Sequence, residues 1–135
     1  MKIDEQIGDT SYGPFLIRIA LGSYFLLAGM EKIPIIPKFV QEVLAFEILP
    51  SELGQMYGLL LPYSEVVVGV MLMLGVWATL TSWISSLMLI SFIIAFGIFP
   101  HSFMFFNKDI ILLAASLSLL YTGAGAFSLD SYLKK

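Results

Sequence analysis

The stretch LLPYSEVVVG, residues 60–69, places one carboxylate, Glu65, inside a run of apolar side chains. The run belongs to a longer apolar segment, residues 56–76, whose length matches the roughly 20 residues that cross a hydrocarbon core of about 30 Å. A charged side chain at membrane depth costs about 2.5–3.5 kcal/mol on insertion scales, so it is expected to face other protein groups. The stretch therefore predicts a membrane-spanning helix with an acid on its protein-facing side.

The composition extends this interpretation to the whole chain. Of its 135 residues, 59% are hydrophobic and only 13% are charged, about half the charge of an ordinary soluble domain, and the mean hydropathy is +0.92. Further runs of membrane-spanning length cover residues 14–33, 80–99 and 109–127. We predict an all-α membrane protein: a single domain, residues 1–135, that forms a four-transmembrane-helix bundle with both termini on one side.

Several classes of site and partner are excluded or disfavoured. The chain has no cysteine, which excludes disulfide chemistry, thiol catalysis and thiolate metal sites. The single histidine, His101, cannot form a bis-histidine haem site, and no metal site is predicted. A net charge of −3 without a basic cluster argues against nucleic acid as a partner. The acidic leader, residues 1–9, differs from the basic start of a signal peptide, so the first run is expected to be a retained helix.

The connections between the spans differ in kind. In the first loop, apolar residues recur at helical spacing over residues 37–48, which predicts a short amphipathic helix in the membrane interface. Only residues 77–79 join the second and third spans, so these two helices are expected to be antiparallel. The lysines and the arginine near the span ends narrowly favour cytoplasmic termini.

Two charges are expected to lie within the membrane, Arg18 in the first span and Glu65 in the second. Arg18 precedes the middle of its span by five or six residues, about 8 Å at ~1.5 Å per residue, which a guanidinium arm can bridge. We predict an Arg18–Glu65 ion pair inside the bundle, which serves either to fix helix register or as a substrate or proton site. A second polar layer is predicted on the loop side, where interfacial snorkelling is the alternative role; its members are Glu31, Lys32, Lys108 and Asp109.

Small residues at helical spacing predict where the helices approach one another, because small side chains let membrane helices pack closely. Some lie beside the charges of the first two spans, and others recur at four-residue steps in the last span, which predicts a central position for that span. The predicted packing residues are Gly22, Gly29, Gly69, Ala114, Ser118, Thr122 and Ala126.

These segments, in this order, resemble the DoxX-like membrane proteins, a group with DoxD and MauE branches. The resemblance covers about residues 15–130, and the Leu-Pro and Leu-Pro-x-x-Glu pattern is closest to the MauE branch. It implies a four-helix fold with cytoplasmic termini in a bacterial or archaeal inner membrane. The matching segments are RIALG at 18–22 with Gly29 and Lys32, LP at 49–50, LPYSE at 61–65 with Gly69, and Lys108-Asp109 before GAG at 123–125 and Asp130.

The resemblance implies a role next to redox chemistry. DoxD-like proteins are the small subunit of a thiosulfate:quinone oxidoreductase, and MauE-like proteins assist the maturation of a periplasmic enzyme in a setting of disulfide chemistry. This chain has no cysteine and lacks the large insert of DoxD-type chains, so it can neither relay disulfides nor be expected to oxidise thiosulfate by itself. The leading expectation is an accessory or assembly subunit of a redox complex, not an enzyme on its own. Its partners would be the lipid bilayer, other membrane or periplasmic subunits, and further copies of the chain.

Two alternatives remain open. In a quinone-reactive subunit, a quinone head group would lie near Tyr63 and Glu65, with Glu65 as the candidate catalytic acid or base, and no cofactor would be bound covalently. In an oligomer, Glu65 and Arg18 could instead line a path for protons or a small solute. A quinone site predicts a pocket of several hundred Å³ beside Glu65. A pure scaffold predicts that Arg18 and Glu65 close on each other without a cavity.

Overall fold

The computed structural model describes residues 7–96 and 107–134, and every regular element in these ranges is helical, as predicted. Pro100 and His101, and the end of the third predicted span, lie outside the described residues. The elements are α1 (Tyr12–Lys32), the 3₁₀ turn η1 (Ile33–Ile35), α2 (Ile36–Ala45), α3 (Ser51–Leu74), α4 (Ala78–Phe96), α5 (Lys108–Thr122) and α6 (Leu129–Leu133).

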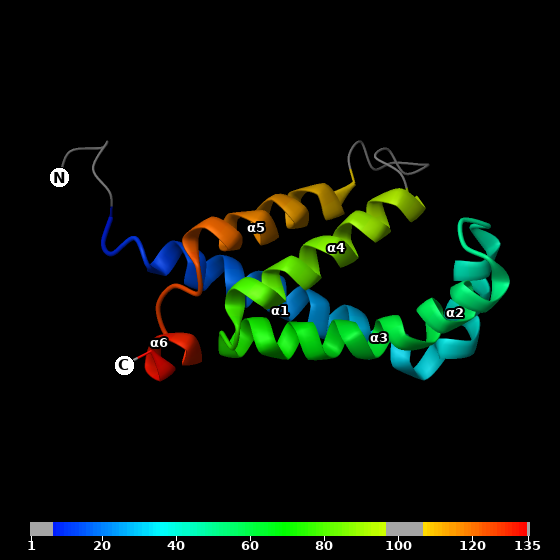
Figure 1. Cartoon of the computed structure of the whole chain (residues 1–135), viewed down its shortest axis with the longest axis horizontal. Helices are drawn as coiled ribbons and strands as arrows, with labels where there is room; N and C mark the ends of the chain where they lie inside the picture. Colours follow the sequence, from blue (N-terminus) through cyan, green and yellow to red (C-terminus); the bar gives the residue numbers. More distant parts are fainter. Residues whose placement is uncertain (1–6, 97–106, 135) are drawn as a thin grey trace.

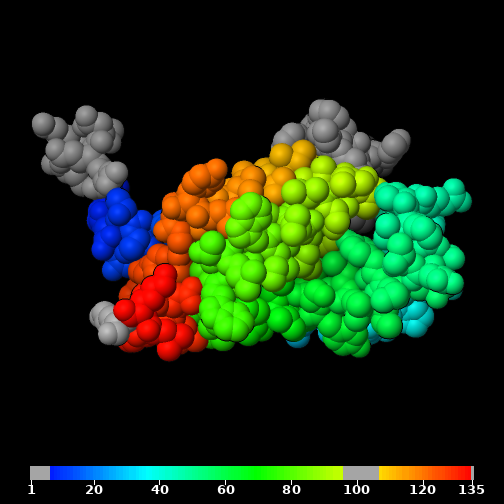
Figure 2. All heavy atoms as spheres, viewed as in Figure 1, coloured from blue at the N-terminus to red at the C-terminus, as the bar shows by residue number. Residues whose placement is uncertain are grey.

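The helices form two antiparallel pairs. α1 packs along α3, and α4 packs along α5 (Figure 1). The start of α1, the α3–α4 turn and α6 lie at one end of the molecule, and α2 lies at the opposite end (Figure 1). Figure 2, from the same side, shows α6 against the end of the molecule where α3 and α4 are joined.

Within the described residues, three helical segments are long and apolar enough to cross a membrane: Tyr12–Ala45, Ser51–Leu74 and Ala78–Ala95. A fourth span over residues 109–127 is not shown. α5 has 15 residues, about 22 Å at ~1.5 Å per residue. It ends at Thr122 because Gly123 adopts a φ of +74°, and positive φ values recur at Gly125 and Phe127.

The amphipathic segment of the first loop is helical and corresponds to α2. It ends at Ala45, earlier than predicted, and Glu47 follows with a φ of +52°. α2 packs on the first turns of α3, where Gly54 lies against Leu44 and Gly58 lies against Val40. These two glycines let α2 fold back closely onto α3.

Glycines also set the crossing of α1 and α3. A Cβ atom at Gly69 would lie 2.5 Å from the backbone N of Leu26, and one at Gly29 would lie 2.6 Å from the carbonyl oxygen of Pro62. Gly22 faces Gly69 in the same way, with a Cβ 2.8 Å from its carbonyl oxygen. Only glycine fits at such backbone-to-backbone distances. Buried apolar side chains surround this crossing, among them Leu21, Phe25, Leu61, Val68 and Leu72.

Buried serines join α4 to α5. The Ser116 hydroxyl lies 2.6 Å from that of Ser85 and 2.9 Å from that of Ser86, and it donates to the Ser82 carbonyl at 3.0 Å. All four serines are buried. Hydrogen bonds of this kind between membrane helices stabilise their association, because the alternative is a polar group in hydrocarbon.

The predicted packing stripe on the last span is wrong. Ala114 and Thr122 are exposed, Ser118 is half-buried, and Ala126 lies beyond the end of α5. α5 is also not central, since it lies beside α4 and α1 while α1 and α3 form the closest pair. The buried face contains Ser116 and Leu119, because the serine hydrogen bonds to α4 select the side opposite the small-residue stripe.

Candidate functional site

The register between α1 and α3 determines which charges can meet. Gly22 lies against Gly69, and Gly29 lies against Pro62 and Val66. In this antiparallel arrangement Glu65 lies level with residues 26–30 of α1. Lys32 is then about one turn away, whereas Arg18 is about ten residues away, roughly 15 Å along the helix axis.

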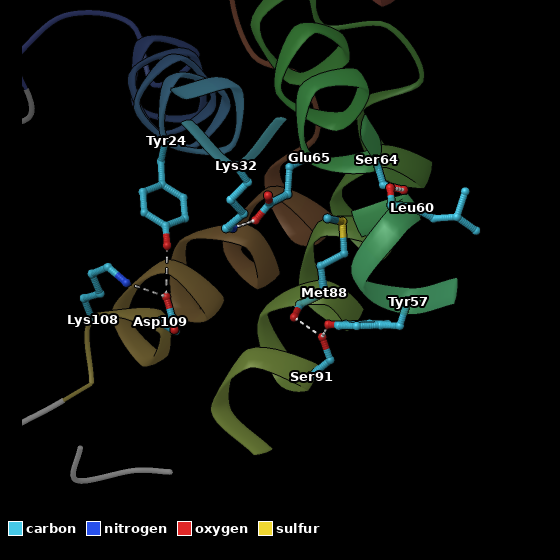
Figure 3. Close-up of polar contacts among 10 residues, drawn as sticks. All are labelled: Tyr24, Lys32, Tyr57, Leu60, Ser64, Glu65, Met88, Ser91, Lys108 and Asp109. Carbon is cyan, nitrogen blue, oxygen red and sulfur yellow. Dashed lines mark hydrogen bonds and ion pairs between the residues drawn. The ribbon is translucent and has the colours of Figure 1, made fainter. Parts of the chain in front are cut away.

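Glu65 accordingly pairs with Lys32 (Figure 3). The Nζ of Lys32 donates to Oε1 of Glu65 at 2.5 Å. The Glu65 side chain is 1% exposed and that of Lys32 is 25% exposed. Nζ also lies 5.4 Å from the ring centroids of Phe39 on α2 and Phe92 on α4, within cation–π range. Among the described residues, Glu65 Oε2 is buried and accepts no hydrogen bond.

The predicted Arg18–Glu65 ion pair is therefore wrong. Arg18 is fully buried, and its Nη1 donates to the carbonyls of Leu72 at 3.1 Å and Met73 at 2.9 Å. Its Nη2 donates to the carbonyls of Ala126 at 3.0 Å and Phe127 at 3.1 Å. Arg18 lies level with the C-terminal end of α3, where the last carbonyls have no intrahelical partner and the helix dipole favours a cation.

Asp130 stabilises the same end of the molecule as Arg18. Its carboxylate accepts from the backbone N–H of Trp77 at 2.8 Å and of Ala78 at 2.7 Å, at the start of α4. The backbone N–H of Asp130 donates to the Gly75 carbonyl at 3.0 Å. Arg18 and Asp130 thus fix the C-terminal segment against the α3–α4 turn, far along α3 from Glu65. Neither residue was assigned this role from the sequence.

The second predicted polar layer divides between two places. Lys32 pairs with Glu65 and not with the other residues of this predicted layer, and Glu31 is exposed. At the start of α5, Asp109 Oδ1 accepts from the Tyr24 hydroxyl and from Lys108 Nζ, each at 3.3 Å (Figure 3). The backbone N–H of Asp109 donates to the Asn107 side chain at 2.9 Å, which caps α5. Tyr24 was not predicted as a partner in this layer.

Tyr57, and not Tyr63, shares a face with Glu65. Tyr57 lies two turns before Glu65, and its hydroxyl is 2.5 Å from that of Ser91 on α4 (Figure 3). Tyr63 is 50% exposed and is rotated by about 200° from Glu65 around the helix. The spacing of Tyr57, Leu61 and Glu65 at four-residue steps was the available sequence signal.

A cavity of about 590 Å³ lies beside these groups, between α2 and the neighbouring ends of α1, α3, α4 and α5. Its walls are mostly apolar, with polar side chains at a few points. Glu65 is not among the described residues that line the cavity, but its ion-pair partner Lys32 is. The polar and charged residues of the wall are Tyr24, Glu31, Lys32, Tyr57, Ser91, Lys108 and Asp109.

The chemistry open to this site is hydrogen bonding and proton exchange in an apolar setting. The Lys32 and Lys108 ammonium groups can donate to a ligand, and carboxylates lie directly behind or beside them. The Tyr24 hydroxyl already donates to Asp109, and the Tyr57 hydroxyl hydrogen bonds to Ser91. Within residues 7–96 and 107–134, no group of three His, Cys, Asp or Glu side chains is arranged to hold a metal ion.

Comparison with known proteins places the chain in a family. The family model described as methylamine utilisation protein MauE matches residues 10–105 of this sequence. No curated protein and no solved structure matches the chain. The matched range contains the Lys32–Glu65 pair, Tyr57 and Ser91, and it supports the MauE branch of the resemblance, not the wider DoxX-like group. Because the match covers more than half of the chain, the protein belongs to the MauE family of membrane proteins.

Proposed function

We propose that the protein is an integral membrane accessory subunit that supports a redox system for methylamine utilisation. The family match over residues 10–105 is the observation that carries this proposal. The absence of cysteine from the sequence supports an assisting role, since any thiol or disulfide step must take place in a partner. The partners would be membrane or periplasmic proteins that contact the exposed faces of the bundle.

The proposed topology is a four-helix bundle in which α5 crosses the membrane together with the loop that follows it. α1 begins, and α6 lies, at the same end of the molecule, which supports termini on one side; the lysine and arginine pattern favours the cytoplasm (Figure 1). The cysteine-free chain permits a direct test with Ser51→Cys at one end and Ser131→Cys at the other. A membrane-impermeant thiol reagent applied outside intact cells should label Ser51→Cys alone. Labelling of both, or of Ser131→Cys alone, contradicts the topology.

The accessory role is tested by removing the protein from its native host. Loss of the chain should leave the methylamine-oxidising enzyme synthesised but inactive, and the wild-type chain should restore its activity. An active enzyme in the absence of the chain contradicts the proposal. Isolation from native membranes provides a second measurement, because an accessory subunit should co-purify with a redox protein or its maturation factors.

A quinone-linked function is the second candidate, and the cavity beside Lys32 favours it. A volume of about 590 Å³ with mostly apolar walls and a few polar side chains is typical of small-molecule sites. The residues present fit a quinone, since the Lys32 ammonium has N–H donors besides the one that meets Glu65 and can donate to a carbonyl oxygen, while Tyr57 lines the same wall. Glu65 could hold a proton and pass it through the Lys32 amine. A bound quinone would supply the electron-accepting chemistry that the side chains lack. Tyr63, half exposed on another face, has no part in this proposal.

Quinone occupancy is measured by extracting the purified protein and comparing its quinone content with that of its co-purified lipids. Enrichment in the wild type that is lost in Lys32→Met supports the quinone-linked function. A quinone-to-lipid ratio no higher than that of the membrane contradicts it. The accessory role does not depend on this result.

A further inference from the structure

We infer that the cavity between α2 and the bundle binds an uncharged amphiphile, whose head accepts a hydrogen bond from Lys32 and whose hydrocarbon chain lies along α2. This binding site is that of the quinone-linked candidate function, on which it rests, with the charge of the ligand head, the orientation of the ligand and its contact residues now specified. The inference requires binding alone, so its test is independent of electron transfer.

The walls of the cavity divide into an apolar part and a polar part. α2 and the segment after it contribute apolar side chains alone to the wall: Phe39, Val43, Phe46, Ile48 and Leu49. The bundle helices add further apolar side chains, such as Leu61 and Phe92. The polar side chains come from α1, α3, α4 and α5. A ligand with one polar end and one hydrocarbon end matches this division, because each end then meets a wall of its own kind.

Lys32 is placed to hold the polar end. Its ammonium group carries three N–H donors, and within the described residues its hydrogen-bond acceptor is Glu65 Oε1. The side chain lines the cavity and is a quarter exposed. The remaining donors can therefore reach an oxygen of a ligand. Tyr57, whose hydroxyl meets Ser91 on the same cavity wall, offers a second polar contact.

The charges at the site favour an uncharged head. Two ammonium groups, Lys32 and Lys108, pair with two carboxylates, Glu65 and Asp109. The exposed Glu31 adds a third carboxylate to the wall, so the described groups at the site carry one more formal negative than positive charge. An anionic head would add like charge where the surroundings screen it poorly. A cationic head would compete with Lys32, which already occupies the position between the Phe39 and Phe92 rings. A neutral head with acceptor oxygens avoids both costs.

The test uses three photoreactive probes with one common hydrocarbon chain, which carries a diazirine at its middle. The heads are glycerol ester (a monoacylglycerol), carboxylate (a fatty acid) and trimethylammonium. The full chain is reconstituted in lipid nanodiscs, and labelled peptides are identified by mass spectrometry over a concentration series. The monoacylglycerol should label residues 39–49 saturably and at the lowest concentration of the three.

Three variants test which side chains contact the polar head of the probe. Lys32→Met combined with Glu65→Gln removes both charges without leaving either unpaired, and it should weaken saturable labelling about tenfold, the effect of one lost charge-assisted hydrogen bond. Tyr57→Phe keeps both charges and should weaken it by a smaller factor, so the contact can be read even if the double variant folds poorly. Lys38→Met is the matched control on α2, because Lys38 is exposed and does not line the cavity. It should label as the wild type does.

Three results would overturn the inference. The first is labelling by the fatty acid or the trimethylammonium probe that saturates at a lower concentration than labelling by the monoacylglycerol. The second is labelling at the wild-type level in both the double variant and Tyr57→Phe. The third is labelling spread over the outer faces of α3 and α4, as expected of bulk lipid. Saturable monoacylglycerol binding by a protein that contains no enriched quinone would uphold the inference and reject the quinone-linked function.

Discussion

Lys32 and Glu65 form an ion pair that joins the last turn of α1 to the middle of α3, with 2.5 Å between Nζ and Oε1. Glu65 is fully enclosed, and Lys32 separates it from the cavity under α2. The pair therefore links the register of α1 and α3 to a wall position through which the buried Glu65 can influence a ligand.

Glu65→Gln should destabilise the protein by about 3 kcal/mol. Removal of one member of a buried pair leaves the other charge uncompensated, which typically costs 3–5 kcal/mol. The lower end is expected because a quarter of the Lys32 side chain is exposed. The free energy of unfolding in mixed micelles measures the effect. Glu42→Gln is the matched control, since Glu42 and Lys38 are both exposed and 4.0 Å apart. It should change stability by less than about 0.5 kcal/mol, and equal losses in the two variants would refute the buried pair.

Arg18→Lys should loosen the C-terminal segment although it keeps the charge. The guanidinium reaches four carbonyls from two nitrogens, and a single ammonium cannot reproduce that fork. We expect a loss of about 1–3 kcal/mol. Amide hydrogen exchange should quicken at residues 126–130, while the amides of α2 stay protected. Unchanged exchange at 126–130 would show that Arg18 does not hold this segment.

Gly69→Ala should push α1 and α3 apart. The new Cβ would lie 2.5 Å from the Leu26 backbone nitrogen, which cannot give way as a flexible side chain would. A loss of about 1–3 kcal/mol is typical of overpacking. Gly13→Ala is the control, because a Cβ there would meet no described atom within 4 Å beyond its chain neighbours and the backbone of its own helix turn. That change should be neutral or stabilise the helix by up to about 1 kcal/mol. If Gly69→Ala were as benign as Gly13→Ala, the close crossing of α1 and α3 would be refuted.

The two tyrosines of α3 should respond differently to loss of the hydroxyl group. Tyr57→Phe removes the hydrogen bond to Ser91 and should cost about 1 kcal/mol. Tyr63→Phe changes a half-exposed side chain on another face and should cost less than about 0.5 kcal/mol. Thermal unfolding of both variants in the same detergent compares them, and the reverse order would contradict the orientation of α3.

The helices themselves could be predicted from the sequence, because apolar length and helical spacing are local properties. The all-helical fold and the amphipathic helix of the first loop follow from them. The second and third spans were expected to pair with each other, but α3 packs mainly along α1 and α4 packs mainly along α5. The end of α5 was missed, because Gly123 stops the helix within an apolar run that continues to Phe127.

Partner choice could not be predicted, because it depends on register. Placing Arg18 and Glu65 by the midpoints of their spans gave a gap of about 8 Å, but the glycine contacts shift α3 so that Lys32, not Arg18, lies near Glu65. The choice of face on α5 failed for a similar reason. A small-residue stripe predicts close packing on its own, yet the hydrogen bonds of Ser116 to α4 turn the stripe outward.

A double-mutant cycle measures the pairing of Glu65 most directly. Lys32→Met, Arg18→Met and Glu65→Gln are made singly and as the two doubles that contain Glu65→Gln, and the free energy of unfolding of each is measured. We predict a coupling of about 1–3 kcal/mol between Lys32 and Glu65, and less than about 0.5 kcal/mol between Arg18 and Glu65. Strong coupling of Glu65 to Arg18, with none to Lys32, would contradict the arrangement of α1 on α3 described above.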